Sequence, residues 1–428
     1  MILAGVTISL LLDENGIIKK SKEGRREYET SKTNEQEQMD NAEDWIDEAV
    51  TGKKSNVVKS FKEAKTENST IDGKKEGNAN NPTIPAGYIP INTETSNWGN
   101  GKDAPSQDSV KHGLVIKDEK NNEWVWVPVD SATLATMYEE SSDEKTLCGT
   151  TGETAVKTKL YSKTITIGTD SNKKTISRTT PGTSSSYREP DLVVGDDGAS
   201  YDAKDTYYKT ILGDTGTKEQ LAQLFADEYK AMIESVSKYG GFYIGRYELS
   251  SEGVQKDKLP LTETNWYNLY KKCTELNASD KVETRMIWGC QWDVTMNWLI
   301  SSGAKTSNEV NKDSSSWGNY KDSTENAKVT VTEEDGTTTN KYGRKQNTGY
   351  SEYWKANNIY DLAGNCYEWT QEAYSANYRA CRGGDYVSYG SSYPASLRSV
   401  DYPDYGDGGG LRFSSNFNNK VESINLSV

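Results

Sequence analysis

Residues Asp385 to Leu411 restrict the possible folds more than any other part of this sequence. The segment consists mostly of Asp, Tyr, Ser and Gly, and it contains no Lys, Glu, Gln, Met, Trp, Phe or Ile. Tyr provides a large, stiff contact surface at low entropic cost, while Ser, Gly and Asp provide polar contacts and turns. The sequence therefore predicts an exposed recognition surface that forms one contiguous face and is held in place by other parts of the chain.

The rest of the chain must build that scaffold from a very polar composition. Only 33% of the 428 residues are hydrophobic, and the mean hydropathy is -0.84. The 11 Trp and 27 Tyr offset this shortage, because aromatic side chains bury the most area per residue. We therefore expect an aromatic-rich core inside polar loops. The net charge of -14 disfavours nucleic acid and anionic membrane surfaces as partners, and it fits an exported protein.

Hydrophobic periodicity predicts three helices. In Lys218–Tyr239 the apolar side chains recur at helical spacing, and Gly240 follows as a stop signal. Two further helices are predicted at Glu263–Leu276 and Gln291–Ser302, each with one apolar face rich in aromatic residues or Met. At helical spacing, these Trp and Met side chains are expected in the core.

Short runs of aromatic and β-branched residues predict strands at Pro85–Ile91, Glu123–Val129 and Gly241–Leu249. A further hairpin is predicted near Lys163–Gly168. Helices and strands do not alternate regularly, and from Asn358 onward only short strands and long loops are expected. This order predicts an α+β fold.

Changes in composition divide the chain into three parts. Residues 1–50 have a helical pattern, residues 51–82 form a polar spacer with little to bury, and residues 83–428 contain the expected ligand-binding domain. Within this domain, residues 140–206 and 304–346 are polar enough to be insertions.

The N-terminal twelve residues are apolar. As a helix they are too short to cross a bilayer unaided, since a helix rises only ~1.5 Å per residue. A short buried or interfacial helix is one interpretation. The run from Ile2 to Lys20 also resembles the N-terminal helix of type IV pilin-like proteins of Gram-positive bacteria, which implies attachment to a pilus or membrane. Those proteins have a Gly-Phe-type junction and a Glu that are missing here, so we expect a truncated or differently processed start.

The sequence argues against a catalytic or zinc site. Its single histidine, His112, lies in V-K-H-G-L, which is typical of an ordinary turn or strand start. The five cysteines contain no C-x-x-C pair. We therefore expect no enzyme, and no catalytic residues are predicted.

Three phrases in the second half of the chain carry a resemblance to a known family. They are G-F-Y-I-G-R-Y-E from Gly241, N-I-Y-D-L-A-G-N-C-Y-E-W-T from Asn358, and R-G-G-D-Y to G-L-R-F from Arg382. Together they resemble the formylglycine-generating-enzyme-like (sulfatase-modifying factor) branch of the C-type lectin fold, over about residues 84–420. The resemblance implies a C-type lectin fold with insertions, preceded here by the long N-terminal helix. The segment Arg285–Trp298 takes the place of a family helix, from which it departs strongly.

The enzyme's chemistry does not carry over with the resemblance. The oxidising cysteines of that family follow the R-G-G phrase, whereas here no cysteine follows Cys381, which precedes Arg382. Copper- and thiol-dependent oxidation needs thiolates at the site. A formylglycine-generating oxidase is therefore disfavoured.

The same fold displays the variable regions of diversity-generating retroelement proteins, which lie between R-G-G and G-F-R-like phrases and change at template adenines. Asn-type codons altered in this way yield Tyr, Ser, Asp, Gly, Val or Leu, but not Lys, Glu, Gln, Met or Trp. An ordinary turn-rich lectin loop is the alternative. The residues expected to contact ligand are Asp385, Tyr386, Val387, Ser388, Tyr389, Ser392, Tyr393, Ser399, Asp401, Tyr402, Asp404, Tyr405 and Asp407. The residues expected to be fixed are Gly390, Pro394, Ala395, Ser396, Arg398, Pro403 and Gly410. Arg398 is expected to bond nearby carbonyls, and Arg382 is expected to bond backbone carbonyls or Glu368.

Two further features are expected beside this region. The resemblance implies calcium, the one cofactor it suggests, at a turn with Asp361, Gly364, Cys366 and Glu368, because hard cations prefer oxygen ligands. In the alternative, Asp361 caps the turn and Glu368 pairs with a core arginine such as Arg382. Cys366 and Cys381 flank a hairpin-sized segment, which predicts a disulfide in an exported protein. Cys273 and Cys290 are a weaker pair.

The function that these features predict is ligand binding by a surface-displayed protein, adhesin-like or receptor-like. Its expected partner is a protein or glycan on another cell, a phage or a host surface, and nucleic acid is not expected. The expected location is extracellular, on the cell surface, with attachment to a pilus or membrane through residues 1–50. A structural pilin-like subunit and a phage tail receptor-binding protein, located in a virion, remain alternatives.

Overall fold

The computed structural model describes sixteen stretches of the chain. They are residues 64, 67–71, 77–93, 105–134, 137, 164–167, 174–177, 208–216, 218–276, 282–324, 329–332, 338–341, 343–375, 378–403, 417–418 and 421–426. The expected N-terminal helix over residues 1–50 lies outside the described residues. Within the part that the structure describes, no helix is both long and apolar enough to span a bilayer.

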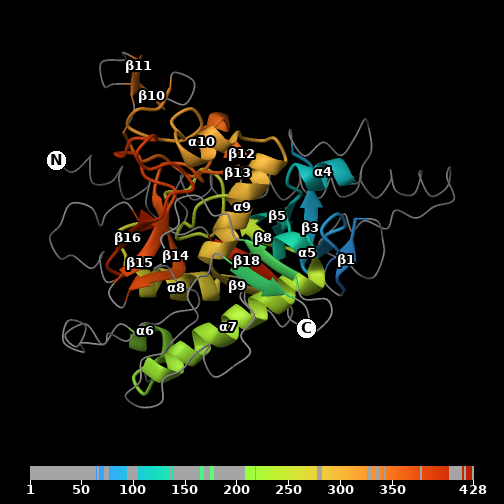
Figure 1. The fold of residues 1–428 in the computed structure, drawn as a ribbon. Helices are drawn as coiled ribbons and strands as arrows, with labels where there is room; N and C mark the ends of the chain where they lie inside the picture. The colour runs from blue at the N-terminus through green and yellow to red at the C-terminus, as the bar shows by residue number, and fades with distance from the viewer. Residues whose placement is uncertain are drawn as a thin grey trace, which may run out of the picture.

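A six-stranded sheet forms one half of the fold (Figure 1). In spatial order its strands are β3 (Tyr88–Ile91), β4 (Val115–Asp118), β5 (Glu123–Pro128), β8 (Gly241–Gly245), β18 (Val421–Leu426) and β9 (Val282–Met286). All neighbours are antiparallel. β18, near the end of the chain, lies between two strands from its middle, so the sheet joins segments that are far apart in the sequence.

A four-stranded sheet carries the segment on which the functional prediction rests. Its strands, in spatial order, are β16 (Ser399–Asp401), β15 (Tyr378–Arg382), β14 (Tyr367–Ser375) and β17 (Phe417–Asn418). β14, β15 and β16 are antiparallel, and β17 pairs parallel to β14. The chain leaves β15 at Arg382, forms a long loop, and returns as β16.

Three helices support these sheets, together with several smaller elements. α7 (Lys218–Tyr239) packs on β8 and β18, while α8 (Trp266–Glu275) packs on β9 (Figure 1). α9 (Gly289–Ser301) packs on both β5 and β14 and so links the two sheets. The short helices are α4 (Gln107–Lys111), α5 (Ser131–Leu134), α6 (Tyr208–Leu212), α10 (Ser307–Asn311) and the 3-10 turn Glu352–Trp354. The two-stranded sheets are β1 (Ser69–Thr70) with β2 (Thr83–Ile84), β6 (Thr164–Ile167) with β7 (Lys174–Ser177), β10 (Val329–Thr332) with β11 (Thr338–Lys341), and β12 (Lys355–Ala356) with β13 (Ile359–Tyr360).

The predicted helices are present, with small shifts at their ends. α7 has the predicted bounds, and Gly240 follows it with φ 77°. α8 begins at Trp266 rather than at Glu263, because the side chain of Asn265 accepts a hydrogen bond from the Asn268 N–H and so caps the helix. α9 begins two residues earlier than predicted. The hairpin expected near Lys163–Gly168 is β6–β7. The fold is therefore a mixture of α and β structure with several small sheets.

The core is aromatic, as the composition predicts. Trp266 stacks on Tyr270 with ring centroids 5.4 Å apart, and Phe225 meets Trp266 edge-on at 5.7 Å. Eight tryptophans have less than 2% of their surface exposed: Trp124, Trp126, Trp266, Trp288, Trp292, Trp317, Trp354 and Trp369. These side chains bury area that the scarce aliphatic residues cannot supply.

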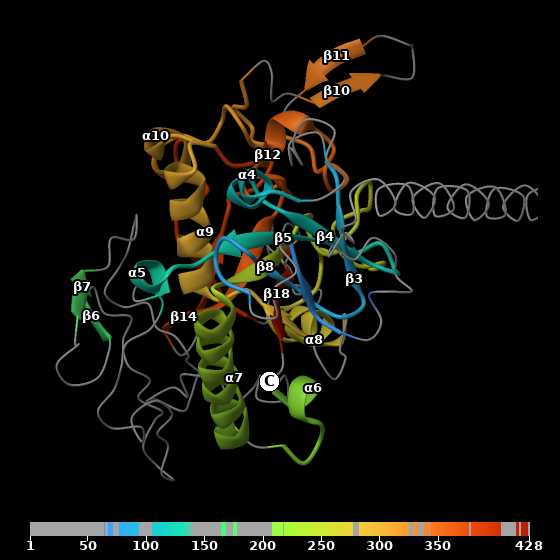
Figure 2. The ribbon, with the colours of Figure 1, turned by 90° about the vertical axis from the view of Figure 1, so that its right-hand side faces the viewer.

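The segment 304–346 differs from the expected insertion. Val310, Trp317 and Tyr320 are buried in the main core, and α10 is capped at Thr306 by a reciprocal capping box with Glu309. The β10–β11 hairpin is the part that projects from the body (Figure 2). The first half of this segment therefore belongs to the domain, and the projecting part begins after about residue 324.

Replacing Trp369 by Ala should lower the free energy of unfolding by about 3–5 kcal/mol, the range of other large-to-small core substitutions. Trp369 lies fully buried on β14. The control is Tyr353→Ala, because that side chain is 57% exposed, and its effect should stay within about 0.5 kcal/mol. Urea unfolding followed by circular dichroism measures both, and equal losses would contradict the buried position.

Candidate ligand-binding surface

The loop that joins β15 to β16 presents a cluster of exposed side chains. Val387 is 44% exposed, Tyr389 is 49% exposed and Tyr393 is 37% exposed. Ser391 and Ser392 beside them are also exposed. We call these five residues the loop patch. The prediction of an exposed surface is confirmed for Val387, Tyr389, Ser392 and Tyr393, and Ser391 is a member that the sequence prediction omitted.

Asp385 is a correction to the predicted site, because only 3% of it is exposed. Its carboxylate accepts a hydrogen bond from the Ser388 hydroxyl, and its carbonyl accepts one from the Ser388 N–H. Ser388 and Tyr386 are half-buried, and the Tyr386 N–H donates to the Asn365 carbonyl at 3.2 Å. Asp385 therefore closes the turn from below instead of facing a ligand.

The predicted ligand residues on β16 lie at the opposite end of the sheet from the loop patch. Asp401 pairs with Arg379, near the start of β15, whereas the loop leaves β15 after Arg382. Four residues of strand place Tyr402 about 13 Å from that point. The Pro403 carbonyl accepts a hydrogen bond from the N–H of Trp266, the first residue of α8, and the Gly390 carbonyl accepts one from the Ser314 N–H, just after α10. In Figure 1, α8 and α10 lie at opposite ends of the sheet.

The expectation of one contiguous face is therefore wrong for the described residues. Ser399, Asp401 and Tyr402 are half-buried. The Tyr378 hydroxyl donates to the Tyr402 hydroxyl at 2.7 Å, and their ring centroids are 4.4 Å apart. Asp404, Tyr405 and Asp407, and the expected fixed residue Gly410, lie outside the described residues.

The main chain of the loop is held by residues 310–323, which we call the clamp segment. The Lys321 N–H donates to the Ser388 carbonyl at 2.8 Å, and the Tyr320 hydroxyl lies 3.0 Å from the Tyr393 carbonyl. The other bonds are Ser314 N–H to Gly390 O at 3.2 Å, Gly390 N–H to Asp322 Oδ1 at 2.7 Å, Ala395 N–H to Ser314 Oγ at 3.0 Å and Ser396 N–H to Val310 O at 3.2 Å. Each of these contacts reaches a main-chain atom of the loop, so none uses a side chain of the loop.

The residues expected to be fixed lie underneath the loop patch. A Cβ atom on Gly390 would be 2.4 Å from the backbone nitrogen of Ser315, so only glycine fits at this close approach. Pro394, Ala395 and Ser396 are buried. This part of the prediction is confirmed, and Pro403 is also buried.

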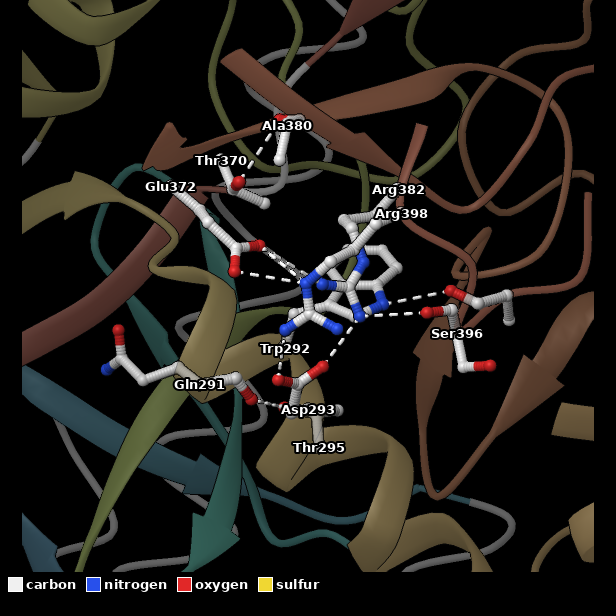
Figure 3. A network of polar contacts seen from close by, with 11 residues as sticks. Gln291, Trp292, Asp293, Thr295, Thr370, Glu372, Ala380, Arg382, Ser396 and Arg398 are labelled. Atoms are coloured by element: carbon white, nitrogen blue, oxygen red, sulfur yellow. Dashed lines mark hydrogen bonds and ion pairs between the residues drawn. The ribbon is translucent and has the colours of Figure 1, made fainter. Parts of the chain in front are cut away.

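Two buried arginines join the ends of the loop to the scaffold (Figure 3). Arg382 donates to Asp293 on α9 at 2.7 Å and to the Ser396 carbonyl at 3.0 Å. Arg398 donates through Nε to Glu372 on β14 at 2.8 Å and also pairs with Asp293. The Nη1 of Arg382 lies 3.5 Å from the Glu372 carboxylate. We call these four residues the anchor network.

The anchor network corrects two predicted contacts. Arg382 does bond a carbonyl, as expected, but its ion-pair partners are Asp293 and Glu372 and not Glu368. Arg398 bonds carboxylates rather than carbonyls. The sequence prediction missed both acidic residues. The signal that could have found them is physical, since two arginines expected beneath a surface need buried carboxylates.

Cys366 and Cys381 do not form the predicted disulfide. None of the four described cysteines, which are all buried, is bridged. Cys381 pairs with Trp369 on the neighbouring strand β14. Cys366 precedes Trp369 by three residues, so Cys366 lies about 10 Å along the chain from the position opposite Cys381 and faces the other side of the sheet. Burial raises the pKa of both thiols, which keeps them protonated and unreactive.

Asp361, in the turn where the resemblance implies calcium, accepts a hydrogen bond from the Gly349 N–H at 2.8 Å. This bond fits the alternative in which Asp361 caps the turn. In the described part of the chain, no group of three or more His, Cys, Asp or Glu side chains could hold a metal ion. The predicted calcium ligands also include backbone carbonyls, at Gly364 and Cys366, so the calcium site at Asp361, Gly364, Cys366 and Glu368 stays a prediction.

Comparison with known proteins places few limits on the chain. No protein-family model matches it, and no curated protein matches it in sequence. Among solved structures, Treponema denticola variable protein 1 matches with 15% sequence identity, covering 43% of this chain and 84% of that chain, with a TM-score of 0.26. A similarity at this level establishes no shared fold.

Removing the Arg382 charge should be costly, because it leaves Asp293 and Glu372 buried with one cation fewer. Breaking a buried ion pair in this way costs about 3–5 kcal/mol, so Arg382→Met should lower the free energy of unfolding by that amount. Arg344→Met is the control, since Arg344 is exposed. Denaturant unfolding of both variants measures the difference. A loss below about 1 kcal/mol for Arg382→Met would show that the anchor network is dispensable.

Proposed function

We propose that this protein binds a macromolecular ligand through the loop patch, on a scaffold of the C-type lectin type. One observation carries the proposal. The clamp segment bonds the main chain of the loop, whereas the exposed side chains point away from the fold. Binding residues that are mounted on a rigid scaffold in this way are typical of recognition surfaces.

The chemistry of the loop patch also suits recognition. Tyr389 and Tyr393 each expose more than a third of their surface, and interface tyrosines are frequent hot spots for binding. Tyr367, which is half-buried on β14, supports Tyr393 from below, because the two rings meet edge-on at 6.0 Å. The Tyr367 hydroxyl also lies 3.2 Å from the Ser388 hydroxyl. The Tyr393 ring is therefore held in place before any ligand arrives, which reduces the entropic cost of binding.

The finer proposal is a variable protein of a diversity-generating retroelement, displayed on a cell surface as an adhesin or receptor. The composition of Asp385–Leu411 and the resemblance of the R-G-G phrase support it. The partner would be a protein or glycan on another cell, phage or host, and residues 1–50 would provide attachment to a pilus or membrane. A pilin-like subunit and a phage tail receptor-binding protein remain alternatives, and binding rather than catalysis is the proposed activity.

The test compares two combinatorial libraries displayed on yeast and challenged with protease. The first randomises the loop patch among Tyr, Ser, Asp, Asn and Gly. The second uses the same residue set at an equal number of positions: Ser314, Tyr320, Asp322, Gly390 and Ala395. Most members of the first library should remain folded, since exposed substitutions usually change stability by no more than about 0.5 kcal/mol each. Most members of the second should be cleaved.

Selection of the first library against an immobilised protein such as lysozyme tests the binding function itself. Binders should appear, and they should lose binding when positions 389 and 393 are changed to Ala, without a change in thermal stability. Equal protease sensitivity of the two libraries would contradict the separation of scaffold and patch. Folded library members that never yield a binder would argue instead for a structural subunit.

A further inference from the structure

The surface beside the loop patch carries a cation that does not belong to the patch. Lys321 is exposed, and its ammonium lies 5.3 Å from the centroid of the Tyr389 ring. The Lys321 N–H donates to the Ser388 carbonyl, so the main chain of the lysine is fixed relative to the loop. A cation at this distance from an aromatic ring is held by cation–π attraction and still faces solvent.

A second exposed cation, Arg344, follows a residue that lies next to both Lys321 and the loop. A Cβ atom on that residue, Gly343, would be 4.0 Å from Lys321 Cγ and 3.3 Å from the Tyr386 carbonyl oxygen. The Arg344 carbonyl accepts a hydrogen bond from Asn319 Nδ2 at 2.8 Å, which fixes its backbone, and its side chain is exposed.

The carboxylates in this region are turned toward the protein. Asp322 accepts the Gly390 N–H, Asp313 accepts the Ser315 N–H, and Asp385 is buried under Ser388. Among the described residues, no carboxylate lies within ion-pair distance of Lys321 or Arg344. Lys321 and Arg344 therefore present two exposed cations near the exposed tyrosines of the loop patch, on a chain whose net charge is -14.

We propose that Lys321 and Arg344 form a constant part of the binding site and select acidic protein segments as ligands. The inference rests on the proposed function and adds the chemical class of the partner. A peptide segment fits both halves of the surface, because its side chains and backbone can pack on Tyr389 and Tyr393 while an Asp or Glu reaches the two cations. Complementary charge of this kind increases association rates and excludes basic partners.

Both cations lie outside Asp385–Leu411. If that segment varies between sibling proteins, Lys321 and Arg344 would remain the same in all of them. Each variant would then recognise a different sequence within a shared preference for acidic surfaces.

The test is selection of a phage-displayed random peptide library on the full-length protein. The expected result is a selected pool enriched in Asp and Glu over the input library. The best peptide should bind the double variant Lys321→Gln/Arg344→Gln at least about tenfold more weakly, and it should dissociate faster at high salt. The matched control is Lys271→Gln/Lys272→Gln, which removes two exposed charges elsewhere on the surface and should leave binding unchanged.

A third variant, Tyr389→Ala/Tyr393→Ala, separates this inference from the proposed function. Neutral peptides that lose binding only in the tyrosine variant would overturn the acidic preference and leave the loop patch as the site. Peptides that bind all variants equally would overturn both. A pool without enrichment, together with retention of anionic glycans on a glycan array, would reassign the surface to glycans and overturn the proposal of an acidic protein partner.

Discussion

The structure of the binding loop depends on two buried arginines that share two carboxylates. Arg382 stands at the start of the loop and Arg398 near its end, and both reach Asp293 and Glu372. A buried ion pair contributes little net stability compared with a well-packed apolar alternative, yet losing one partner is expensive. Its main effect here is therefore geometric. It fixes the two ends of the loop against α9 and β14, and the clamp segment then bonds the main chain between them.

This arrangement separates the residues that fold the protein from those that contact a ligand. The loop is held by main-chain bonds to the clamp segment, by the close approach of Gly390 to Ser315, and by the buried run that begins at Pro394. Exposed side chains of the loop patch contribute little to any of these contacts. A surface built in this way can change its chemistry without losing its backbone conformation, which a loop packed through its own side chains cannot do.

The elements with strong periodicity were predictable from sequence, and the contacts made by the main chain were not. α7 has its predicted bounds because apolar spacing and a glycine stop agree. The aromatic core followed from the scarcity of aliphatic residues. The clamp segment was overlooked because Trp317 and Tyr320 stand alone in a polar run, and its decisive bonds come from backbone atoms or from Ser and Asp side chains. The disulfide prediction was wrong because the length of the segment between Cys366 and Cys381 indicates only that these residues are near each other. The strand register decides whether their side chains can form a bond.

The two ends of the predicted binding segment differ in how closely their side chains pack against the rest of the protein. The Tyr389 ring meets the clamp segment through the cation–π approach of Lys321, and the residue is 49% exposed. Tyr402 is tilted against Tyr378 and shares a hydroxyl–hydroxyl bond with it at the edge of the sheet. A change at position 402 therefore disturbs a neighbour that belongs to β15, whereas a change at position 389 leaves the loop backbone bonded as before. Because Tyr402 lies about 13 Å along the sheet from the point where the loop leaves β15, a ligand on the loop patch does not need Tyr402. Tolerance to substitution should then be greatest where the clamp, and not the sheet edge, holds the chain.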